Sequence, residues 1–517
     1  MPRRLASAVR RRVRYAWSRV TRRQGRPPAE AALEWLIRSD TGEGIPANSA
    51  ESIGCPAVTA ASIETALAFG CRDEARRWAR WLVSIQRPDG SIPDARLAAS
   101  SFENTAQAVR GFLAILDDLP EVEEAARRAC HYLRSWIDDE GRVRPPSDDH
   151  RPNPGDPVAD ELPYLVPLLK AGRRWSVADW TTAVDRVVEC WAGDTKAFPW
   201  MESVGGIARH AEQYLEHGRS FAAEKMMEGI STVQRRDGAV PERLGAGPVL
   251  GTSLALAAIL WYRLGGRVQG DRAMRYLERR QLQCGGFRGG WGWLVPGSLR
   301  RENPWTAKHY LDAALLQVRA AFDTDLPICP DPIPSADGRV RAVREWLESL
   351  SPDARVADVG CGMGRYLRHL VGWFPRAQWT GIDVSPAMLD WLPDGVTTCQ
   401  GSLLRIPAVD GAFDGAFAVE SLEHSLVPER AIGELCRVVR PGGRVLVIDK
   451  HRAKQPLSEH DPWERWFLPE ELAGWLGRYC DDVSVAPVSH SEGRGGHDLF
   501  LAAQGTRKMR ACADDSP

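Results

Sequence analysis

Apolar positions between residues 31 and 322 recur with the spacing of amphipathic helices, and these helical stretches come in pairs. Examples are AVTAASIETALAFG (57–70) and LGTSLALAAILWYRLGG (250–266),. A similar turn separates the pairs: WLVSIQRPDGSIPD (81–94) is echoed by GISTVQRRDGAVPE (229–242). The glycines of these turns lie at intervals of roughly 45–52 residues and are Gly42, Gly90, Gly141, Gly193, Gly238 and Gly286,. Six units of one period predict an internal repeat of helix pairs.

Helix pairs of this kind are too amphipathic to be stable alone, so neighbouring pairs must pack together. Six pairs can close into a ring with one helix of each pair inside, and the fold class predicted for residues 31–322 is an all-α (α/α)6 toroid. An open helical solenoid is the alternative. In period and turn style the region resembles the α/α-toroid superfamily, which includes terpene cyclases, prenyltransferase β subunits and six-hairpin glycosidases. It lacks the DxDD acid motif of a cyclase, and no matched Asp, Cys and His set indicates a zinc site.

Polar residues recur near the starts of the second helices, where a closed ring would gather them around one opening. They are Glu103, Asn104, Asp160, Glu161, His210, Glu212, Lys308 and His309. A pair of carboxylates there could perform the acid–base chemistry of a glycosidase. Helix capping and a solvated rim account for the same residues, because each pair also suits the first turn of a helix.

The pattern changes after a Pro-rich stretch, DTDLPICPDPIPSADG (323–338), which is typical of a linker between domains,. Strands and helices then alternate. RVADVGCGMGRYLRHL (355–370) contains a buried strand, a glycine loop and the start of a helix, and AQWTGIDVS (377–385) contains a second strand that ends in Asp383. Glycines in such a loop let a ligand approach the backbone, and a carboxylate at the end of the second strand can accept hydrogen bonds from both hydroxyls of a ribose.

The glycine loop reads GxGxG and follows an Asp, whereas a dinucleotide-binding loop reads GxGxxG,. This arrangement resembles that of class I S-adenosylmethionine-dependent methyltransferases, and the resemblance covers residues 340–506. Further segments agree with the family in order: VTTCQGSLLRIP (396–407), GAFDGAFAVESLEHS (411–425), AIGELCRVVRPGGRVLVIDK (431–450) and EHDPWERWFLPEEL (459–472). The resemblance implies a Rossmann-like α/β domain with a seven-stranded sheet, and S-adenosyl-L-methionine as cofactor.

Position by position, the resemblance also implies which residues bind the cofactor: Asp358, Gly360, Cys361, Gly362, Gly364, Asp383, Val384, Met388, Ser402, Leu403, Ala418 and Glu420. Asp358 would orient the glycine loop near the methionine amino group, and Asp383 would contact the ribose. Val384 and Met388 would flank the adenine, while Ala418 and Glu420 would lie beside the methionine part and the transferring methyl group. Ser402 stands where the family usually has an acidic residue.

Methyl transfer needs alignment of the acceptor more than side-chain chemistry, because the sulfonium is already activated. A hydroxyl acceptor would also need a base. His424, His451 and His460 are the candidates, since they follow the fourth and fifth strands, where the acceptor should enter. Each histidine could equally be structural.

The first 26 residues, MPRRLASAVRRRVRYAWSRVTRRQGR, are rich in Arg, contain no acidic residue and carry one apolar stripe,. Such a helix can lie on an anionic membrane surface. A solvated basic arm, or a helix packed on the next domain, is the alternative. We expect residues 1–30 to form an arm, followed by the toroid (31–322), the linker (323–338), the methyltransferase domain (339–506) and a C-terminal tail (507–517).

The whole chain has a net charge of −1, which gives no reason to expect nucleic acid as a partner,. Its eleven cysteines are scattered without a CxxC motif, as in reduced proteins of the cytoplasm,. No apolar run is long enough to cross a membrane,. We therefore expect a cytoplasmic protein with peripheral contact to the inner face of the membrane.

Together these patterns predict a methyltransferase that acts on a cell-surface glycan, a lipid-linked sugar or a related small molecule, with the toroid holding the acceptor. One alternative is a bifunctional protein whose toroid is a separate hydrolase or epimerase on the same glycan. Another is a scaffold that binds S-adenosylmethionine without catalysis, which the intact glycine loop and Asp383 disfavour.

Overall fold

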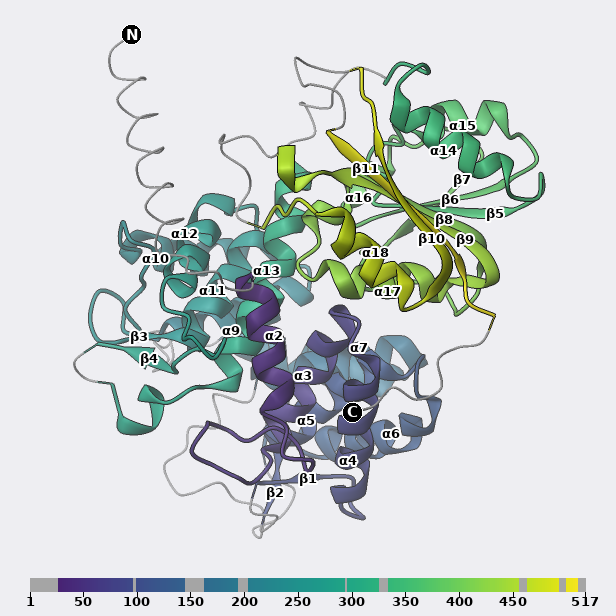
Figure 1. The fold of residues 1–517 in the computed structure, drawn as a ribbon. Coiled ribbons are helices and arrows are strands. Elements are labelled where there is room, and N and C mark those ends of the chain that lie inside the picture. Colours follow the sequence, from purple (N-terminus) through teal and green to yellow (C-terminus); the bar gives the residue numbers. More distant parts are fainter. Residues whose placement is uncertain are drawn as a thin grey trace. The chain divides into compact units, whose positions relative to one another are not determined.

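A computed structural model describes most of the chain (Figure 1). The described residues are 27–95, 99–144, 162–193, 203–292, 295–324, 333–454, 463–491 and 499–509. They form two compact units, one from Pro28 to Gln317 and one that begins at Val318. This division lies within a single helix, α13 (Pro304–Thr324), whereas the sequence predicts the second domain to begin at 339. The predicted basic helix of residues 1–26, with its apolar stripe, lies outside the described residues.

The first unit is helical. Its remaining helices are α2 (Pro28–Arg38), α3 (Pro56–Ala68), α4 (Arg72–Ile85), α5 (Phe102–Ile115), α6 (Glu123–Ser135), α7 (Val166–Trp175), α8 (Ala178–Gly193), α9 (Val204–Glu216), α10 (Ser220–Val233), α11 (Gly251–Arg263) and α12 (Arg267–Glu278). Nearly every residue of α3 and α11 is buried, whereas α4 and α12 bury one face only. Helices that are covered on all sides therefore alternate along the chain with helices that keep a solvated face.

The repeated turn phrase fixes each helix pair to the next. After α4, the Gln86 side-chain amide donates to the carbonyl of Gly90 (3.0 Å) and to that of Ala125 in α6 (2.9 Å). Gln234 repeats this arrangement after α10, with bonds to the carbonyls of Gly238 (3.5 Å) and Gln269 of α12 (3.0 Å). One Gln in each phrase thus closes its own turn and binds a helix of the next pair.

Several of the turn glycines are required because a helix of the next pair lies against them, whereas a Cβ at Gly42 would have no atom within 4 Å. Gly90 has φ +88°, and a Cβ there would lie 2.3 Å from the carbonyl oxygen of Arg128 in α6. In the sixth turn this position belongs to Gly285 (φ +95°) and not to the predicted Gly286, which packs on the Trp35 ring. Gly193, another predicted turn glycine, is the last residue of α8.

The first and last helix pairs of the unit contact each other. Gln281, in the sixth turn, donates to the carbonyl of Pro28 at the start of α2 (2.8 Å). The Thr65 hydroxyl of α3 donates to Asp312 of α13 (2.7 Å). The two ends of the helical array are therefore bound to each other.

The second unit is built on a mixed seven-stranded sheet with the order β10-β11-β9-β8-β5-β6-β7. The strands are β5 (Arg355–Val359), β6 (Gln378–Asp383), β7 (Val396–Gln400), β8 (Phe413–Val419), β9 (Val439–Lys450), β10 (Cys480–Val488) and β11 (Phe500–Arg507). Strands β5 to β9 are parallel, and β11 is antiparallel to both of its neighbours. The predicted Rossmann-like domain with seven strands is confirmed.

Helices cover both faces of this sheet, as its apolar strands require. In Figure 1, α14 (Gly338–Glu348) and α15 (Leu367–Trp373) lie on one face, and α17 (Pro428–Val438) and α18 (Pro469–Gly477) lie on the other. The short helix α16 (Pro386–Leu389) follows β6. From β5 the chain first builds β6 and β7 on one side, and it then crosses to build β8 and β9 on the other. Ligands bind outside the carboxyl ends of the strands where such an order reverses, which here is between β5 and β8.

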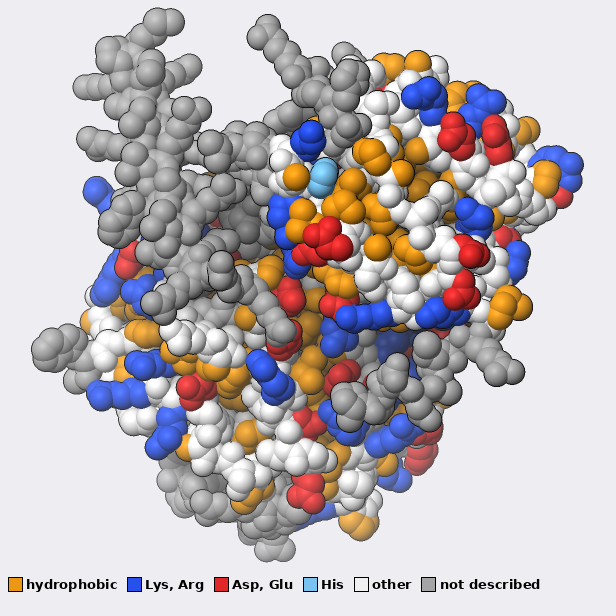
Figure 2. All heavy atoms as spheres, in the orientation of Figure 1, with side chains coloured by type: hydrophobic (Ala, Val, Ile, Leu, Met, Phe, Trp, Pro, Cys, Tyr) orange, Lys and Arg blue, Asp and Glu red, His pale blue; other side chains and the backbone are white. Residues whose placement is uncertain are grey.

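Basic and acidic side chains are interspersed on the face shown in Figure 2, in keeping with the small net charge of the chain. Within the described ranges, none of the helices has the length and apolarity that a membrane span requires.

Candidate cofactor and acceptor site

The glycine loop leaves the carboxyl end of β5 with three residues at positive φ: Gly360 (+76°), Gly362 (+53°) and Gly364 (+78°). The backbone N–H groups of Gly360 and Cys361 donate to the carbonyl of Ile382 in β6 (2.7 and 3.1 Å), which fixes the loop to the neighbouring strand. A Cβ at Gly362 would have no atom within 4 Å. The loop therefore has open space at its middle glycine, where a ligand can approach the backbone.

Asp383, at the end of β6, supports this loop. Its carboxylate accepts hydrogen bonds from the N–H of Gly362 and from the N–H of Ser385, both at 2.9 Å. Burial raises the pKa of Asp383, which is 8% exposed, and the backbone donors counteract this only in part. The side chain predicted to bind the ribose thus already holds the glycine loop in place.

Asp358 is the fourth residue of β5 and is 2% exposed. Its Oδ2 atom has no hydrogen-bond partner among the described residues. Burial, and next the charge of Asp383, raises its pKa well above the ordinary value. A buried carboxylate in this position fits a ligand that brings an ammonium group, such as the amino group of S-adenosylmethionine.

Asp358→Asn should increase the stability of the protein at neutral pH by about 1–2 kcal/mol, because Asn cannot ionise and the variant therefore avoids a buried negative charge close to Asp383,. The folded-state pKa is raised, so the stability that protonated Asp358 contributes is complete below the unfolded pKa near 4 and is lost as the pH rises. The advantage of the variant should therefore vanish below about pH 4. Urea unfolding at the two pH values measures it, and an equal difference at both would contradict the assignment.

Glu420, immediately after β8, has φ +53°, a conformation that non-glycine residues seldom adopt,. Its Oε1 atom accepts hydrogen bonds from the Tyr366 hydroxyl (2.6 Å) and from Arg339 of α14 (2.7 Å). Arg339 is 1% exposed and also binds both oxygens of Asp337, at 3.0 and 3.1 Å. Sequence reasoning missed these partners of Glu420, and the only signal is the Asp-Gly-Arg start of α14, a pattern that many surface helices share.

The other predicted cofactor residues lie around the same edge of the sheet. Val384, Met388 and Leu403 are half-buried, and Ala418 is buried within β8. The thiol of Cys361 is buried, which raises its pKa. Ser402 closes a local turn, in which its hydroxyl accepts from the N–H of Arg405 (3.2 Å).

The end of α13 also contacts this edge. Asp323 accepts a hydrogen bond from the hydroxyl of Ser385 (2.6 Å), two residues after Asp383. Phe322 lies edge-on to His424, with ring centroids 5.0 Å apart. Asp323 was predicted to begin the linker of residues 323–338, so these contacts are ones that sequence reasoning missed. Residues 325–332 of that stretch lie outside the described residues.

His424 lies in a partly buried polar cluster at the carboxyl ends of β8 and β9, defined here as Glu423, His424, Asp449 and Lys450. The His424 Nε2 atom is 3.3 Å from Glu423, whose carboxylate also binds the Lys450 ammonium (2.9 Å). His424 Nδ1 is buried, and no described residue hydrogen-bonds to it. Burial, followed by the charge of Glu423, raises the pKa of Asp449 well above its ordinary value.

The remaining histidine candidates differ from His424. His451 is half-buried at the end of β9, where its backbone N–H donates to the carbonyl of Leu499 (2.8 Å). His460 lies outside the described residues. The structure therefore places one of the three candidates, His424, within a charged cluster.

In the helical unit, several residues of the predicted ring mouth have local partners. The Asn104 side chain donates to the carbonyl of Pro93 (2.7 Å), and His210 Nδ1 is 2.9 Å from the carbonyl of Gly206. Lys308 binds Asp312 (2.7 Å). Burial lowers the pKa of His309 well below its ordinary value. Of the other predicted mouth residues, Glu103 and Glu212 are described, while Asp160 and Glu161 lie outside the described residues.

Comparison with known proteins agrees with this geometry. The family model "Methyltransferase domain" matches residues 357–447, which include the glycine loop, Asp383, all of β8 and most of β9. Among curated proteins, the chain is 35% identical over 120 residues to the O-methyltransferase cnsE of Penicillium expansum, covering 21% of this chain and 43% of that protein.

Two other relatives have different acceptors in their names. The 2-methyl-6-phytyl-1,4-hydroquinone methyltransferase of Synechocystis is 32% identical over 161 residues (29% of this chain, 50% of that protein). The malonyl-[acyl-carrier protein] O-methyltransferase of Methylococcus capsulatus is 34% identical over 123 residues (21% and 45%). The chain thus spans half or less of the length of these relatives.

Among solved structures, a SAM-dependent methyltransferase from Aquifex aeolicus is 18% identical with a TM-score of 0.28, covering 37% of this chain and 98% of that one. The family model and the relatives show that the chain contains a methyltransferase domain. Its seven-stranded sheet has the strand order of the class I fold, and its cofactor is S-adenosyl-L-methionine.

Proposed function

We propose that the protein transfers a methyl group from S-adenosylmethionine to a hydroxyl group of a cell-surface glycan, a lipid-linked sugar or a related small molecule. The observation that carries this proposal is the meeting of Asp358, Asp383 and the glycine loop where the strand order reverses, between β5 and β8. O-Methyltransferases among the relatives support an oxygen acceptor. The class of acceptor is inferred from the side chains of the helical unit, which are described below.

The residues of the second unit have separable roles in this proposal. Asp358 receives the ammonium group of the cofactor, and Asp383 binds the ribose while it holds the Gly362 N–H. Glu420, held by Arg339 and Tyr366, lies beside the methionine part. Bound there, the cofactor supplies an electrophilic methyl group.

His424 is the proposed base for the acceptor hydroxyl. Glu423 lies 3.3 Å from its Nε2 atom and can orient the ring, and the Nδ1 atom is not hydrogen-bonded to any described residue. Phe322 packs against the ring in a T-shaped arrangement, with centroids 5.0 Å apart. A base held in this way can take the hydroxyl proton as the oxygen attacks the methyl group.

We place the acceptor in the helical unit and propose that this unit is an (α/α)6 toroid. The contact of its first and last helix pairs supports a closed ring. Charged side chains on its most buried helices support a polar acceptor: Glu64 of α3 binds Arg110 of α5 (2.6 Å), and the two are 43% and 33% exposed. The charge of Arg110 lowers the pKa of Glu64 to about 2. Ionised groups in such a position suit the hydroxyl groups of a glycan.

Residues 1–26 are the proposed site of peripheral membrane contact in a cytoplasmic protein. Their support is the Arg-rich amphipathic pattern of the sequence,.

Calorimetry on the full-length protein tests the proposal. S-Adenosylmethionine should bind, and Asp383→Ala should weaken binding by about 10- to 100-fold, because the ribose hydroxyls and the Gly362 N–H lose their charged acceptor. Asp390→Ala, at an exposed carboxylate that follows α16, is the matched control and should bind as the parent does.

Profiling the metabolites of a deletion strain then identifies the acceptor. We expect a glycan or a lipid-linked sugar that lacks one methyl group. A folded protein that binds no S-adenosylmethionine would contradict the function, and a sterol or fatty acyl product would contradict the proposed acceptor.

A further inference from the structure

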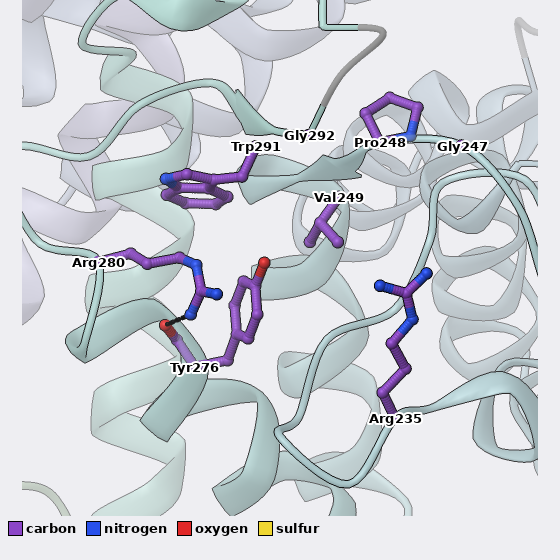
Figure 3. A pocket seen from close by; sticks show the side chains of 8 residues that line it. All are labelled: Arg235, Gly247, Pro248, Val249, Tyr276, Arg280, Trp291 and Gly292. Carbon is purple, nitrogen blue, oxygen red and sulfur yellow. Dashed lines mark hydrogen bonds between the residues drawn. The ribbon is translucent and has the colours of Figure 1, made fainter.

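The helical unit contains an open cavity of about 430 Å³ that is separate from the residues of the cofactor site (Figure 3). It lies between the elements of the last two helix pairs. Its lining residues are Arg235, Gly247, Pro248, Val249, Tyr276, Arg280, Trp291 and Gly292. They come from the turn after α10, from the end of α12 and the residues that follow it, and from the short strands β3 (Val249–Leu250) and β4 (Gly290–Trp291).

Two aromatic rings and an arginine form one wall. The rings of Tyr276 and Trp291 meet edge to face, with centroids 5.9 Å apart and an interplanar angle of 84°. The guanidinium carbon of Arg280 lies 3.5 Å from the centre of the Tyr276 ring, and Arg280 Nη1 donates to the Tyr276 carbonyl (3.4 Å). Arg280 is therefore held in place by stacking, while a guanidinium group has further N–H donors to offer.

A second guanidinium faces the cavity from the other side. In Figure 3, Arg235 lies on the opposite side of Tyr276 from Arg280, and its guanidinium group points toward the rim at Pro248 and Gly247. Its side chain is exposed. The lining includes no acidic residue. Asp237, in the same turn as Arg235, is the nearby acid that raises the pKa of Tyr276, although burial contributes more to that shift. The lining of the cavity is therefore positively charged.

Glycines keep the rim of this cavity open. Gly247 and Gly292 have φ of +90° and +126°, values that disfavour any side chain at these positions,. A Cβ at Gly292 would lie 3.3 Å from Cα of Pro248. The two strands can therefore approach each other while the space above Tyr276 and Trp291 stays free of side chains from the rim.

We infer that this cavity binds a sugar ring that carries a phosphate or carboxylate group. The volume is that of a small-molecule pocket,. Two guanidinium groups suit a planar or tetrahedral anion, which they bind through paired N–H donors. The apolar faces of Trp291 and Tyr276 offer the contact surface that the C–H groups of a sugar ring need. The inference is independent of methyl transfer, because none of these residues belongs to the cofactor site.

Titration calorimetry on the full-length protein tests the inference with four probes: glucose 1-phosphate, glucuronate, glucose and inorganic phosphate. We expect one or both charged sugars to bind, and glucose and phosphate to bind at least about tenfold more weakly, since each lacks half of the recognised chemistry. Preference for glucose 1-phosphate or for glucuronate identifies the anion. Absence of binding by both charged sugars, or equal binding of inorganic phosphate, would overturn the inference.

Variants locate the binding to this cavity. Arg235→Gln and Arg280→Gln should each weaken binding of the charged sugar by about tenfold. Arg236→Gln is the matched control, because Arg236 is exposed in the same turn but does not line the cavity, and it should bind within about twofold of the parent,. All three should still bind S-adenosylmethionine as the parent does, which separates this test from that of methyl transfer. Equal effects of Arg235→Gln and Arg236→Gln would overturn the assignment of the site.

Discussion

Arg339→Met should lower the free energy of unfolding by about 3–5 kcal/mol, because it removes one partner of a buried ion pair. Arg339 and Asp337 are 1% and 0% exposed, and the guanidinium binds both carboxylate oxygens. In the variant, Asp337 would keep its bonds from the N–H and hydroxyl of Ser491 (2.7 and 2.9 Å) but would lose its countercharge. Urea unfolding of the full-length protein, followed at the transition of the second unit, measures the loss.

The loss should depend on pH. Burial alone would raise the pKa of Asp337, but the hydrogen bonds from Arg339 and Ser491 outweigh it and hold the pKa well below its ordinary value. A depressed pKa contributes stability that is present above the unfolded pKa, near 4, and is lost as the pH falls toward the folded pKa. The difference between parent and variant should therefore be largest at neutral pH and shrink in acid.

Arg341→Met is the control for this variant. Arg341 lies two residues further along α14 and is exposed, so its replacement should change stability by no more than about 0.5 kcal/mol,. Arg339→Met should also weaken S-adenosylmethionine binding, because Glu420 would retain Tyr366 but lose Arg339. If Arg339→Met and Arg341→Met had the same free energy of unfolding, the Arg339–Asp337 ion pair would not contribute to the stability of the second unit.

His424→Ala should lower kcat by about 100-fold or more with the acceptor identified by metabolite profiling, since removal of a positioned base typically has such an effect. The affinity for S-adenosylmethionine should not change, because no predicted cofactor contact involves this side chain. The measurement is a steady-state methylation assay together with calorimetry of cofactor binding.

His451→Ala is the matched control, since His451 follows β9 at the same edge of the sheet but lies outside the Glu423 cluster. We expect its kcat to stay within a few-fold of the parent value. Glu423→Gln should give an intermediate loss, because His424 would keep its place but lose the carboxylate at Nε2. Equal losses in the two histidine variants, or no loss in His424→Ala, would remove His424 from the mechanism.

Local patterns predict the second unit well because the residues at the carboxyl edge of its sheet, where the cofactor is predicted to bind, lie close together in the sequence. A strand, three glycines and a strand-ending Asp383 follow one another within about 25 residues, and the structure places them together as expected,. The hydrogen bonds that Arg339 and Tyr366 donate to Glu420 could not be predicted in this way. Arg339, Tyr366 and Glu420 lie far apart in the sequence and meet only through the packing of α14 and the glycine loop against β8.

Two other differences have physical reasons of the same kind. Residues 323–338 are rich in prolines, which begin at Pro327, so the sequence predicts a linker from residue 323. In the structure α13 continues to Thr324, and its Phe322 and Asp323 contact His424 and Ser385 at the carboxyl edge of the sheet. In the sixth turn, Gly285 and Gly286 are adjacent, so sequence alone does not decide which has the positive φ. In the structure the positive φ is at Gly285, where a Cβ would lie 2.1 Å from the carbonyl oxygen of Ala31 in α2.

The bonds between the first and last helix pairs bear on how the helical unit loses its structure. In an open array of repeats, each end has a neighbour on one side only, and unfolding can begin there and spread inward. Here the Pro28 carbonyl accepts a hydrogen bond from the Gln281 side chain, and the Thr65 hydroxyl donates one to Asp312. The first and last helix pairs therefore have neighbours on both sides. If the unit is the closed ring proposed above, it has no free end at which unfolding can start, and its helices should melt in one cooperative transition and not pair by pair.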